Sequence, residues 1–399
     1  MTNRATVVTG LGCLSAAGRD LDTAWKNMMT GVARPHPPTK IRVETKRLSP
    51  VFEVADGEWR PSNIPLERPV DKTLSVEYFL SAFEEALKQA GLSVEDLRGR
   101  RVGVCLGTTV GCTLNDERFY RDFRTGLEPG LGAIRRFLDN NPAQFASEAL
   151  DLRGPVCTIN NACSSGTDAV GQAREWIQDG LCDIVIAGGT DELSRIPYLG
   201  FSALLNTSEK ACKPFDARRD GLNLGEGAGV LIVESRDHAA RRGAPALVEV
   251  GGYGCSADAH HITAPHPGGL GLERAVRQAL ADRDPRQVSF INAHGTATVP
   301  NDMVEGQTLA RLFGPKVAVV GTKSYTGHAL GAAGALEAVF TVQGLVKGEI
   351  PTTRGFEEPD PECVVVPTVK PTGVARTYAI STSLAFGGTN SAILMSVVP

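Results

Sequence analysis

"VCTINNACSSGTDAVGQAREWIQDG", residues 156–180, turns from a strand pattern into a helix pattern within a few residues. The stretch opens on an apolar run of four residues, and after Thr167 apolar side chains recur at helical spacing, at Val170, Ala173 and Ile177. A short strand that leads directly into an amphipathic helix is the repeating unit of α/β proteins. The stretch therefore predicts an α/β fold. It also places the turn "NACSSG" at a strand end, where α/β proteins bind ligands.

The alternation of strands and helices continues along the chain and starts afresh after residue 245. We expect strands at 5–10, 101–107, 156–160, 183–189, 229–235, 246–254, 288–295, 317–322, 378–383 and 391–397, and helices at 73–91, 271–282, 302–313 and 331–346. A chain of 399 residues is too long for one ordinary core. We therefore expect two α/β halves, residues 1–243 and 244–399, with the Pro-rich, charged segment 34–72 as a surface excursion of little regular structure.

The composition argues against several classes of protein. The formal net charge is −4, from 45 acidic and 41 basic side chains, and it favours neither nucleic acid nor an anionic membrane as a partner. The opening "MTNRATVVTGLG" does not read as a secretory signal peptide, and no run approaches the roughly 20 apolar residues that span a bilayer. The nine cysteines include no CxxC pair, so we expect reduced thiols, no zinc site and a cytoplasmic protein.

Two short patterns suggest ligands that their surroundings do not support. "GLG" at 10–12 opens like a dinucleotide-binding turn, but Ser15 stands where the third glycine belongs, which argues against NAD. "DAHHITAPHPGG" at 258–269 holds three histidines, which zinc could use, but its prolines and glycines favour a plain loop.

Cys163, inside the "NACSSG" turn, is a candidate nucleophile. It lies where a strand turns into the N-terminus of a buried helix. Free N–H groups and the helix dipole lower the pKa of a thiol at such a position, and the same N–H groups can hold an oxyanion. The alternative is a buried, inert cysteine, which is our interpretation of Cys157 in the preceding strand.

Two loops at strand ends carry further candidates. "NAHGTAT", 292–298, places His294 at the end of a strand, followed by the hydroxyl residues Thr296 and Thr298. "LAFGGTNSAI", 384–393, has two adjacent glycines after Phe386, which suggest that the backbone there approaches something closely. Taken alone, the first can equally be a structural histidine and the second a plain turn.

The stretch "GTKSYTGHALGAAGALEAV", 321–339, combines charge with an apolar helix. Lys323 and His328 lie in the turn before the helix, and Glu337 lies in its middle. A buried carboxylate needs a partner, and Lys323 is the nearest candidate in the sequence. An exposed Glu337 on a surface helix is the alternative, but no other charged residue occurs from 329 to 346.

Together these blocks resemble the β-ketoacyl-[acyl-carrier-protein] synthase family of the thiolase superfamily. The resemblance rests on "NACSSGTDAV", "KPFDARRDGLNLGEGAGVLIVES", "NAHGTATVPND", "TKSYTGHALGAAGALEA" and "FGGTN", and it runs over nearly the whole chain. His328 stands where the initiating synthases have Asn, so the two-histidine, elongating type is indicated. Thiolases share the fold but lack these blocks.

The resemblance implies a role for each candidate. Cys163 is the expected nucleophile, which takes an acyl chain from a carrier-protein thioester. His294 and His328 are expected to bind the malonyl thioester carbonyl, drive loss of CO2 and stabilise the enolate. Lys323, held by Glu337, is expected to set charge and geometry around His328.

Further positions match binding residues of the family. The backbone N–H groups of Cys163 and Phe386 resemble the oxyanion hole, and Phe386 also resembles the residue that gates the acyl site. Thr296 and Thr298 resemble the threonines that bind the phosphopantetheine arm. No redox cofactor is required. Residues that resemble the surroundings of a structural monovalent cation in some relatives are Asn292, Glu305, Glu337, Ser381 and Thr382.

The implied protein is a five-layered αβαβα acyltransferase of two similar halves, the first carrying Cys163 and the second the two histidines. It would catalyse decarboxylative Claisen condensation to a 3-oxoacyl-[acyl-carrier protein] in fatty acid or polyketide elongation. Its partners would be an acidic acyl carrier protein, met by a basic patch with Arg135 and Arg136 as candidates, and a second copy of the chain. A heterodimer with a Cys-less synthase-like subunit stays open.

Departures from the family pattern leave the pathway open. "CSSG" differs from the motifs common in housekeeping elongating enzymes, and Ala385 replaces a frequent glycine beside the gating loop. "NACSSG" leans toward the synthases of aryl polyene pathways. The alternatives are a non-catalytic, chain-length-factor-like partner subunit, which would lack the nucleophilic cysteine, and a Cys-dependent hydrolase.

Overall fold

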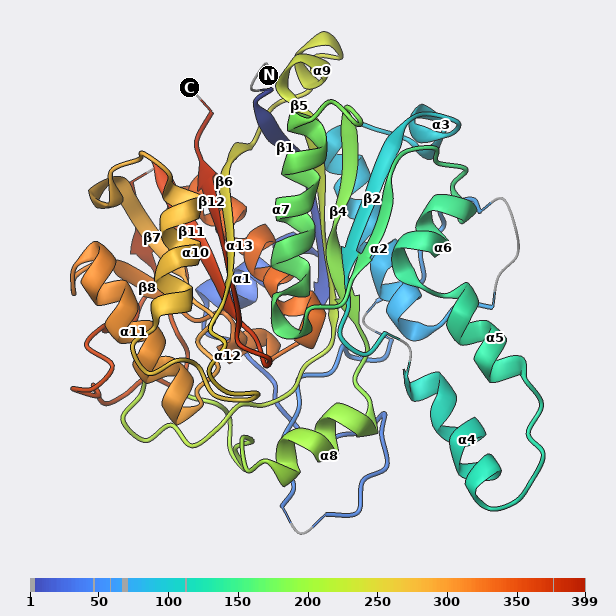
Figure 1. The fold of residues 1–399 in the computed structure, drawn as a ribbon, viewed down its shortest axis with the longest axis horizontal. Coiled ribbons are helices and arrows are strands. Elements are labelled where there is room, and N and C mark those ends of the chain that lie inside the picture. The colour runs from blue at the N-terminus through green and yellow to red at the C-terminus, as the bar shows by residue number, and fades with distance from the viewer. Residues whose placement is uncertain are drawn as a thin grey trace.

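The computed structural model describes residues 4–45, 47–57, 59–66, 71–111, 113–375 and 377–398 (Figure 1). The first five long strands are β1 (Thr6–Ser15), β2 (Val102–Gly107), β3 (Val156–Ile159), β4 (Ile184–Asp191) and β5 (Gly227–Ser235). The second five are β6 (Val248–Ala257), β7 (Val288–Asn292), β8 (Ala318–Val320), β11 (Tyr378–Leu384) and β12 (Thr389–Ser396). Two short strands, β9 (Glu349–Ile350) and β10 (Thr372–Gly373), pair with each other.

The helices lie between and around these strands. Those before β5 are α1 (Leu21–Met29), α2 (Leu74–Ala90), α3 (Val94–Leu97), α4 (Thr113–Arg124), α5 (Gly132–Asp139), α6 (Pro142–Ala149), α7 (Ser165–Gln178) and α8 (Arg195–Ala203). Those after it are α9 (Arg236–Arg241), α10 (Leu270–Leu280), α11 (Val299–Phe313), α12 (Lys323–Thr326) and α13 (Ala333–Lys347). Three short 3-10 turns are η1 (Ala162–Ser164), η2 (Pro285–Gln287) and η3 (Leu330–Ala332).

The strand order repeats between the two halves of the chain. The ten strands run β3-β2-β4-β5-β1-β6-β12-β11-β7-β8, so each half has the same order when its strands are numbered from its own start. The directions repeat as well: β3, β2 and β4 are parallel, as are β8, β7 and β11, and the remaining pairs are antiparallel. A short pairing of β1 with β6 joins the halves. The predicted pair of similar α/β halves is therefore present, while the boundary at 243/244 stays a prediction.

Two buried helices lie between the sheet halves. Helices α7 and α13 contact each other and strands of both halves, whereas α2 covers the outer face of the first half and α10 that of the second. Small residues allow this close approach: a Cβ on Gly166 would lie 2.6 Å from the Ala335 nitrogen, and one on Gly334 would lie 2.2 Å from Thr167 Oγ1. The resulting five layers are the fold class expected from the sequence (Figure 1).

The expected elements and the observed ones agree where the apolar pattern is strong. The predicted helix 73–91 is α2, which ends at Gly91 in the left-handed conformation. The described part of segment 34–72 contains no helix and only isolated bridges. Among the helices of eight residues or more, α1, α4, α5, α6 and α8 were not predicted. Two of them give a weak signal, because α4 is rich in charge and α5 buries no residue. In the described part of the chain, no helix is long and apolar enough to cross a membrane.

Candidate active site

Two equivalent strand-to-helix turns meet at the centre of the molecule. In the first half β3 leads through η1 into α7, and in the second half β8 leads through α12 and η3 into α13, with η1 and η3 in contact. Ala162 and Leu330, one in each turn, have φ values of 49° and 52°. Left-handed backbone in residues other than glycine costs on the order of 1–3 kcal/mol and clusters at functional sites. Cys163 directly follows the first strained residue.

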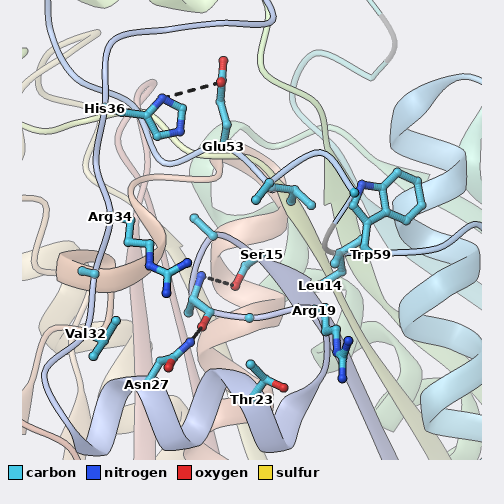
Figure 2. Close-up of a pocket in the computed structure, with 17 residues that line it drawn as sticks. Leu14, Ser15, Arg19, Thr23, Asn27, Val32, Arg34, His36, Glu53 and Trp59 are labelled. Carbon is cyan, nitrogen blue, oxygen red and sulfur yellow. Dashed lines mark hydrogen bonds and ion pairs between the residues drawn. The ribbon is translucent and has the colours of Figure 1, made fainter.

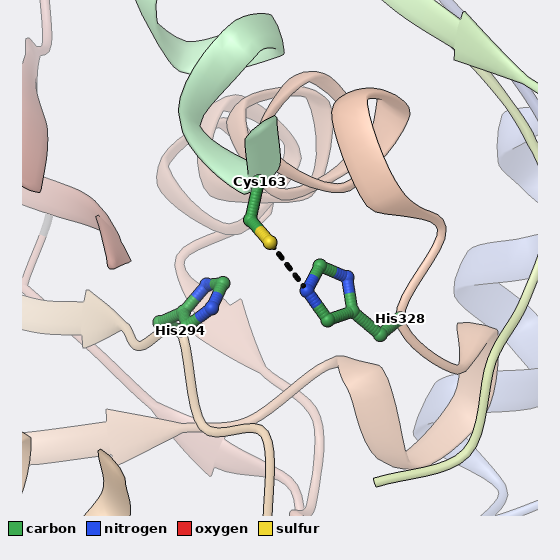
Figure 3. Close-up of side chains that lie close together, drawn as sticks. All are labelled: Cys163, His294 and His328. Atoms are coloured by element: carbon green, nitrogen blue, oxygen red, sulfur yellow. Dashed lines mark hydrogen bonds between the residues drawn. The ribbon is translucent and has the colours of Figure 1, made fainter. Parts of the chain in front are cut away.

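Cys163 and the two histidines lie together although they come from three separate segments (Figure 3). All three are buried, with Cys163 only 4% exposed. His328 Nε2 lies 3.0 Å from Cys163 Sγ. The rings of His294 and His328 are perpendicular, with centroids 5.3 Å apart. The fold thus brings the predicted nucleophile and the predicted histidine pair into one cluster.

The hydrogen bonds of the two imidazoles fix which ring nitrogen carries the proton. The Leu330 N–H donates to His328 Nδ1 at 3.2 Å, and Lys323 Nζ donates to His294 Nδ1 at 3.0 Å. Burial, and then the charge of Lys323, lower the pKa of both histidines well below the usual range, so both rings are neutral. Because each Nδ1 accepts, each Nε2 carries the hydrogen. Two N–H donors therefore serve the pocket around Sγ.

Lys323 contacts a different histidine from the one predicted. Its Nζ bonds to His294 and forms an ion pair with Glu337, and both charged residues are buried. The prediction that Lys323 sets the charge around His328 agrees with its effect on the pKa of that ring, whereas its hydrogen bond goes to His294, just after β7. Lys323 affects His328 only through its charge. Burial raises the pKa of Glu337 to about 7.

The pKa of Cys163 is raised, not lowered. Burial raises it to about 11, although the N–H groups of Phe386 and Cys163 and the charge of Lys323 act in the opposite direction. The predicted low-pKa thiolate is therefore wrong for the closed site, because desolvation outweighs the N–H donors. The N–H groups of Phe386 and Cys163 do reach the sulfur, which is the arrangement that an oxyanion hole needs.

This raised pKa predicts how Cys163 responds to pH. With a pKa of about 11, the rate of alkylation by iodoacetamide should rise about tenfold per pH unit between about pH 7 and 10, because only the thiolate reacts. Peptide mass spectrometry after timed alkylation measures the rate at Cys163, with the exposed Cys255 as the internal control. An alkylation rate of Cys163 that has stopped rising with pH by about pH 7 would instead support the low-pKa thiolate.

The pocket over Cys163 is nearly closed. Its cavity volume is about 50 Å³, and its walls include Cys163, both histidines and Phe386. The Phe386 ring lies against Phe201, with centroids 5.1 Å apart. Such a volume holds one or two waters, so an acyl chain can enter only after a side chain moves. Phe386 lies before Gly387 and Gly388, both with positive φ, which suits the predicted gate.

Thr296 and Thr298 also line the pocket, and their hydroxyls share a hydrogen bond of 3.0 Å. The loop that carries them is anchored by Glu305, which accepts the N–H groups of His294 and Gly295 at 2.8 Å each. The two threonines therefore face the access route to Cys163.

The sequence analysis missed two residues of the site. Asp191, at the end of β4, accepts hydrogen bonds from four groups of residues 108–111 and from the Gly331 N–H, and so ties the first half to η3. Asp191 could have been found from the sequence, because it is the acid that ends the apolar run "IVIAGGTD". Phe201, on α8, packs against Phe386 with the two rings tilted by 32°, and nothing in the sequence marks it.

The residues predicted around a monovalent cation form one cluster. Ser381 pairs with Asn292 across β11 and β7, Asn292 Nδ2 donates to the Glu337 carbonyl, and Thr382 Oγ1 donates to Glu305. Glu337 Oε2 and Ser381 Oγ are buried and have no hydrogen-bond partner among the described residues. An orphaned carboxylate oxygen and an orphaned hydroxyl in this buried cluster fit an oxygen-ligated cation.

Cys163, His294 and His328 also satisfy the spacing of a metal site, with ligand atoms within 4.8 Å of one another. A metal would need the Nε2 lone pairs, whereas both Nδ1 atoms accept hydrogen bonds and leave the hydrogen on Nε2. The cluster is therefore built to donate hydrogen bonds. No such spacing occurs among the described residues of 258–269, where the Nδ1 atoms of His261 and His266 accept backbone N–H groups.

A second, larger cavity of about 430 Å³ lies between the loop after β1 and the segment 32–59 (Figure 2). His36 lies 3.9 Å from Glu53 there, and Asn27 Nδ2 donates to the Ala17 carbonyl. None of the predicted site residues lines it, so it is separate from the Cys163 pocket.

Comparison with known proteins matches these observations. Residues 3–239 match the beta-ketoacyl synthase N-terminal domain, and residues 247–357 match the beta-ketoacyl synthase C-terminal domain. The chain is 36% identical to 3-oxoacyl-[acyl-carrier-protein] synthase 2 of Staphylococcus aureus (strain N315), over 98% of both chains. It superposes on the ishigamide ketosynthase/chain length factor with a TM-score of 0.92, 30% identity and full coverage of both chains. It also resembles AntDE:AntF, a type II PKS acyl-carrier protein in complex with its ketosynthase bound to the hexaketide, with a TM-score of 0.88, 29% identity and full coverage of both chains.

Proposed function

The chain belongs to the beta-ketoacyl synthase family, and we propose that it condenses an acyl group held on Cys163 with malonyl-[acyl-carrier protein] to give a 3-oxoacyl-[acyl-carrier protein] and CO2. One observation carries the proposal: a buried thiol 3.0 Å from His328 Nε2, with a second neutral imidazole beside it. This arrangement joins a nucleophile to two donors that can hold an enolate.

In the first step Cys163 Sγ attacks the carbonyl of the incoming thioester. A new S–C bond forms, the bond to the carrier thiol breaks, and the thiol proton of Cys163 passes to that departing sulfur. The N–H groups of Cys163 and Phe386 hold the oxyanion, because both point at the region of the sulfur. Because the resting pKa of the Cys163 thiol is about 11, the thiol is protonated before the attack and loses its proton as the S–C bond forms.

In the second step the first carrier thiol has left, and the malonyl thioester enters the pocket by the same route. Its C–C bond to the carboxylate breaks, CO2 leaves, and the electron pair becomes an enolate whose oxygen accepts the Nε2–H groups of His294 and His328. The enolate carbon then attacks the acyl carbonyl on Cys163, a C–C bond forms and the thiolate is released. Lys323 and Glu337 position His294, since Lys323 Nζ holds its Nδ1. Thr296 and Thr298 face the route that a phosphopantetheine arm would take.

The direct test is a reconstitution with an acyl-loaded and a malonyl-loaded carrier protein. The expected products are one 3-oxoacyl-carrier protein and one CO2 for each acyl group consumed. A non-catalytic partner subunit would give neither product, and a Cys-dependent hydrolase would release free acid. The contact between Cys163 and His328 favours the condensing enzyme over the partner subunit.

No group beyond the carrier's phosphopantetheine takes part in these steps. A monovalent cation would be held by oxygens of Asn292, Glu305, Glu337 and Ser381, and would hold the backbone beneath His294 by charge alone.

A cytoplasmic location fits a substrate delivered by a carrier protein. The aryl polyene branch stays a prediction from the stretches "NACSSG" and "CKPFDARRDGLNLGEGA".

We further propose that the chain assembles with a second synthase-like subunit through the β3 edge. β3 ends the strand order, and pairs with β2 on one side only among the described residues. An unpaired strand edge favours pairing with another chain. Helix α6 contacts β3, and α4, α5 and the link between them, which precede α6 in the chain, expose large apolar side chains: Tyr120, Phe123, Leu127, Leu131 and Leu138. The similar structure with a TM-score of 0.92 is the ishigamide ketosynthase/chain length factor, so a heterodimer fits as well as a homodimer.

The edge proposal predicts a change of oligomeric state. Val156→Lys, on β3 and 37% exposed, should convert a dimer into a monomer in light scattering after size exclusion, because a charge then faces the partner strand. Val32→Lys, at a matched exposure of 38%, should leave the dimer intact. A Val156→Lys protein that stays dimeric would place the interface elsewhere.

A further inference from the structure

A buried carboxylate lies between the two strand-to-helix turns of the site. Asp191, at the end of β4, is fully buried. Its Oδ2 accepts the Gly331 N–H of η3 at 2.6 Å. Its two oxygens also accept the Thr108 hydroxyl at 2.6 Å and the N–H groups of residues 109–111 at 2.8–3.1 Å. One side chain thus holds η3 against the loop that follows β2.

In the second half of the chain, this arrangement fixes the donor to His328. The Leu330 N–H, next to that of Gly331, donates to His328 Nδ1 at 3.2 Å. This bond leaves the hydrogen on Nε2, which lies 3.0 Å from Cys163 Sγ. A Cβ on Gly331 would lie 2.6 Å from the Thr109 nitrogen, so the backbone of η3 lies directly against the loop after β2. A shift of η3 would therefore weaken the bond that sets the tautomer of His328.

In the first half of the chain, the same loop holds the residue before Cys163. Thr109 Oγ1 donates to the Ala162 carbonyl at 3.0 Å, while the Thr109 N–H donates to Asp191. Ala162 has a left-handed φ of 49°, a conformation that persists only where its surroundings hold it. Thr109 therefore connects Asp191 to the turn that directs Cys163.

The charge of Asp191 allows it to serve all of these donors. Burial raises its pKa to about 6, while the Thr108 hydroxyl and the backbone N–H groups act in the opposite direction, so the carboxylate is ionised at neutral pH. Both oxygens of an ionised carboxylate accept hydrogen bonds, whereas an amide has one accepting oxygen and one donating nitrogen. An asparagine here would turn its NH2 group either toward the Gly331 N–H or toward the loop.

From these contacts we propose that Asp191 is a positioning residue that sets the contact between Cys163 Sγ and His328 Nε2 (Figure 3). It acts through Leu330 on the histidine and through Thr109 on the turn before the cysteine. Because both turns are tied to one carboxylate, two groups from different halves of the chain keep a fixed separation. This inference rests on the proposed function, in which that contact serves the acylation step.

The test is the single-turnover rate at which an acyl-[acyl-carrier protein] acylates Cys163. Asp191→Asn should lower this rate about tenfold, because one buried N–H group then has no acceptor and its turn shifts. Thr109→Val keeps the N–H and loses only the hydroxyl bond to Ala162, and should lower the rate about threefold. Glu234→Gln changes another fully buried carboxylate, at the opposite end of the β4–β5 pair, and should leave the rate unchanged.

A double-mutant cycle separates positioning from a general loss of structure. In a His328→Ala background the contact is already absent, so Asp191→Asn should lower the acylation rate by no more than about twofold further. In a His294→Ala background it should keep its full effect of about tenfold, because His294 has no hydrogen bond to Asp191 or to η3 among the described residues. A merely structural role would lower the rate by the same factor in both backgrounds.

Two results would overturn the positioning role. One is an acylation rate that is unchanged in both Asp191→Asn and Thr109→Val. The other is an equal loss in the His328→Ala and His294→Ala backgrounds. If Asp191→Asn does not fold, Thr109→Val in the same two backgrounds provides the comparison. Wild-type protein that is not acylated at all would instead overturn the proposed function, so the two failures are distinguishable.

Discussion

Cys163→Ala should abolish formation of the 3-oxoacyl product, with a loss of at least about 10⁵-fold in turnover, because the acyl group then has no covalent carrier. The residue is buried between η1 and η3, and neither neighbouring side chain can replace it as a nucleophile, since both imidazoles carry hydrogen on Nε2. The measurement is the rate of 3-oxoacyl-carrier protein formation by mass spectrometry.

A matched control separates chemistry from folding. Cys182→Ala removes another buried thiol, just before β4 and away from the pocket lining. It should keep full activity, and both variants should unfold within a few degrees of the wild type. Substantial condensation by Cys163→Ala would contradict the role of this residue.

His294→Ala should lower the rate of condensation by about 10²–10³, the usual effect of removing one donor from a developing oxyanion. No hydrogen bond joins His294 to Cys163 Sγ among the described residues, whereas His328 Nε2 lies 3.0 Å from that sulfur. The acyl group should therefore still reach Cys163 in His294→Ala, and only the decarboxylation and C–C bond formation should slow. Single-turnover kinetics with pre-acylated enzyme and malonyl-carrier protein measures that step.

Two companion variants sharpen this prediction. His294→Gln keeps an N–H donor of similar reach and should recover part of the rate, which a merely structural role would not explain. His328→Ala should slow acylation and condensation alike, because it loses the donor next to the sulfur as well. If His294→Ala and His328→Ala lost the same factor in the rate of acylation, the assignment of acylation to His328 alone would be wrong.

Local patterns in the sequence anticipated much of the fold. The alternation of strands and helices predicts both halves, and the lone charge in an apolar helix predicts that Glu337 needs a buried partner; the structure contains its ion pair with Lys323. These inferences succeed because the spacing of apolar and charged residues within a single segment indicates which side chains are buried.

Features that depend on tertiary packing could not be anticipated. The helix N-terminus argument predicted a low pKa for Cys163, but the depth at which α13 and the Phe386 loop bury the thiol raises it to about 11. Lys323 is closer in sequence to His328, yet its side chain reaches His294.

Intact-protein mass spectrometry after incubation with a short-chain acyl-[acyl-carrier protein] shows whether Cys163 carries the acyl group. We expect a mass gain of one acyl group per chain, located on the peptide that contains Cys163 and lost on addition of malonyl-carrier protein as the 3-oxoacyl product appears. A folded protein that gains no acyl group, or gains it on another residue, would contradict the assignment of Cys163 as the nucleophile.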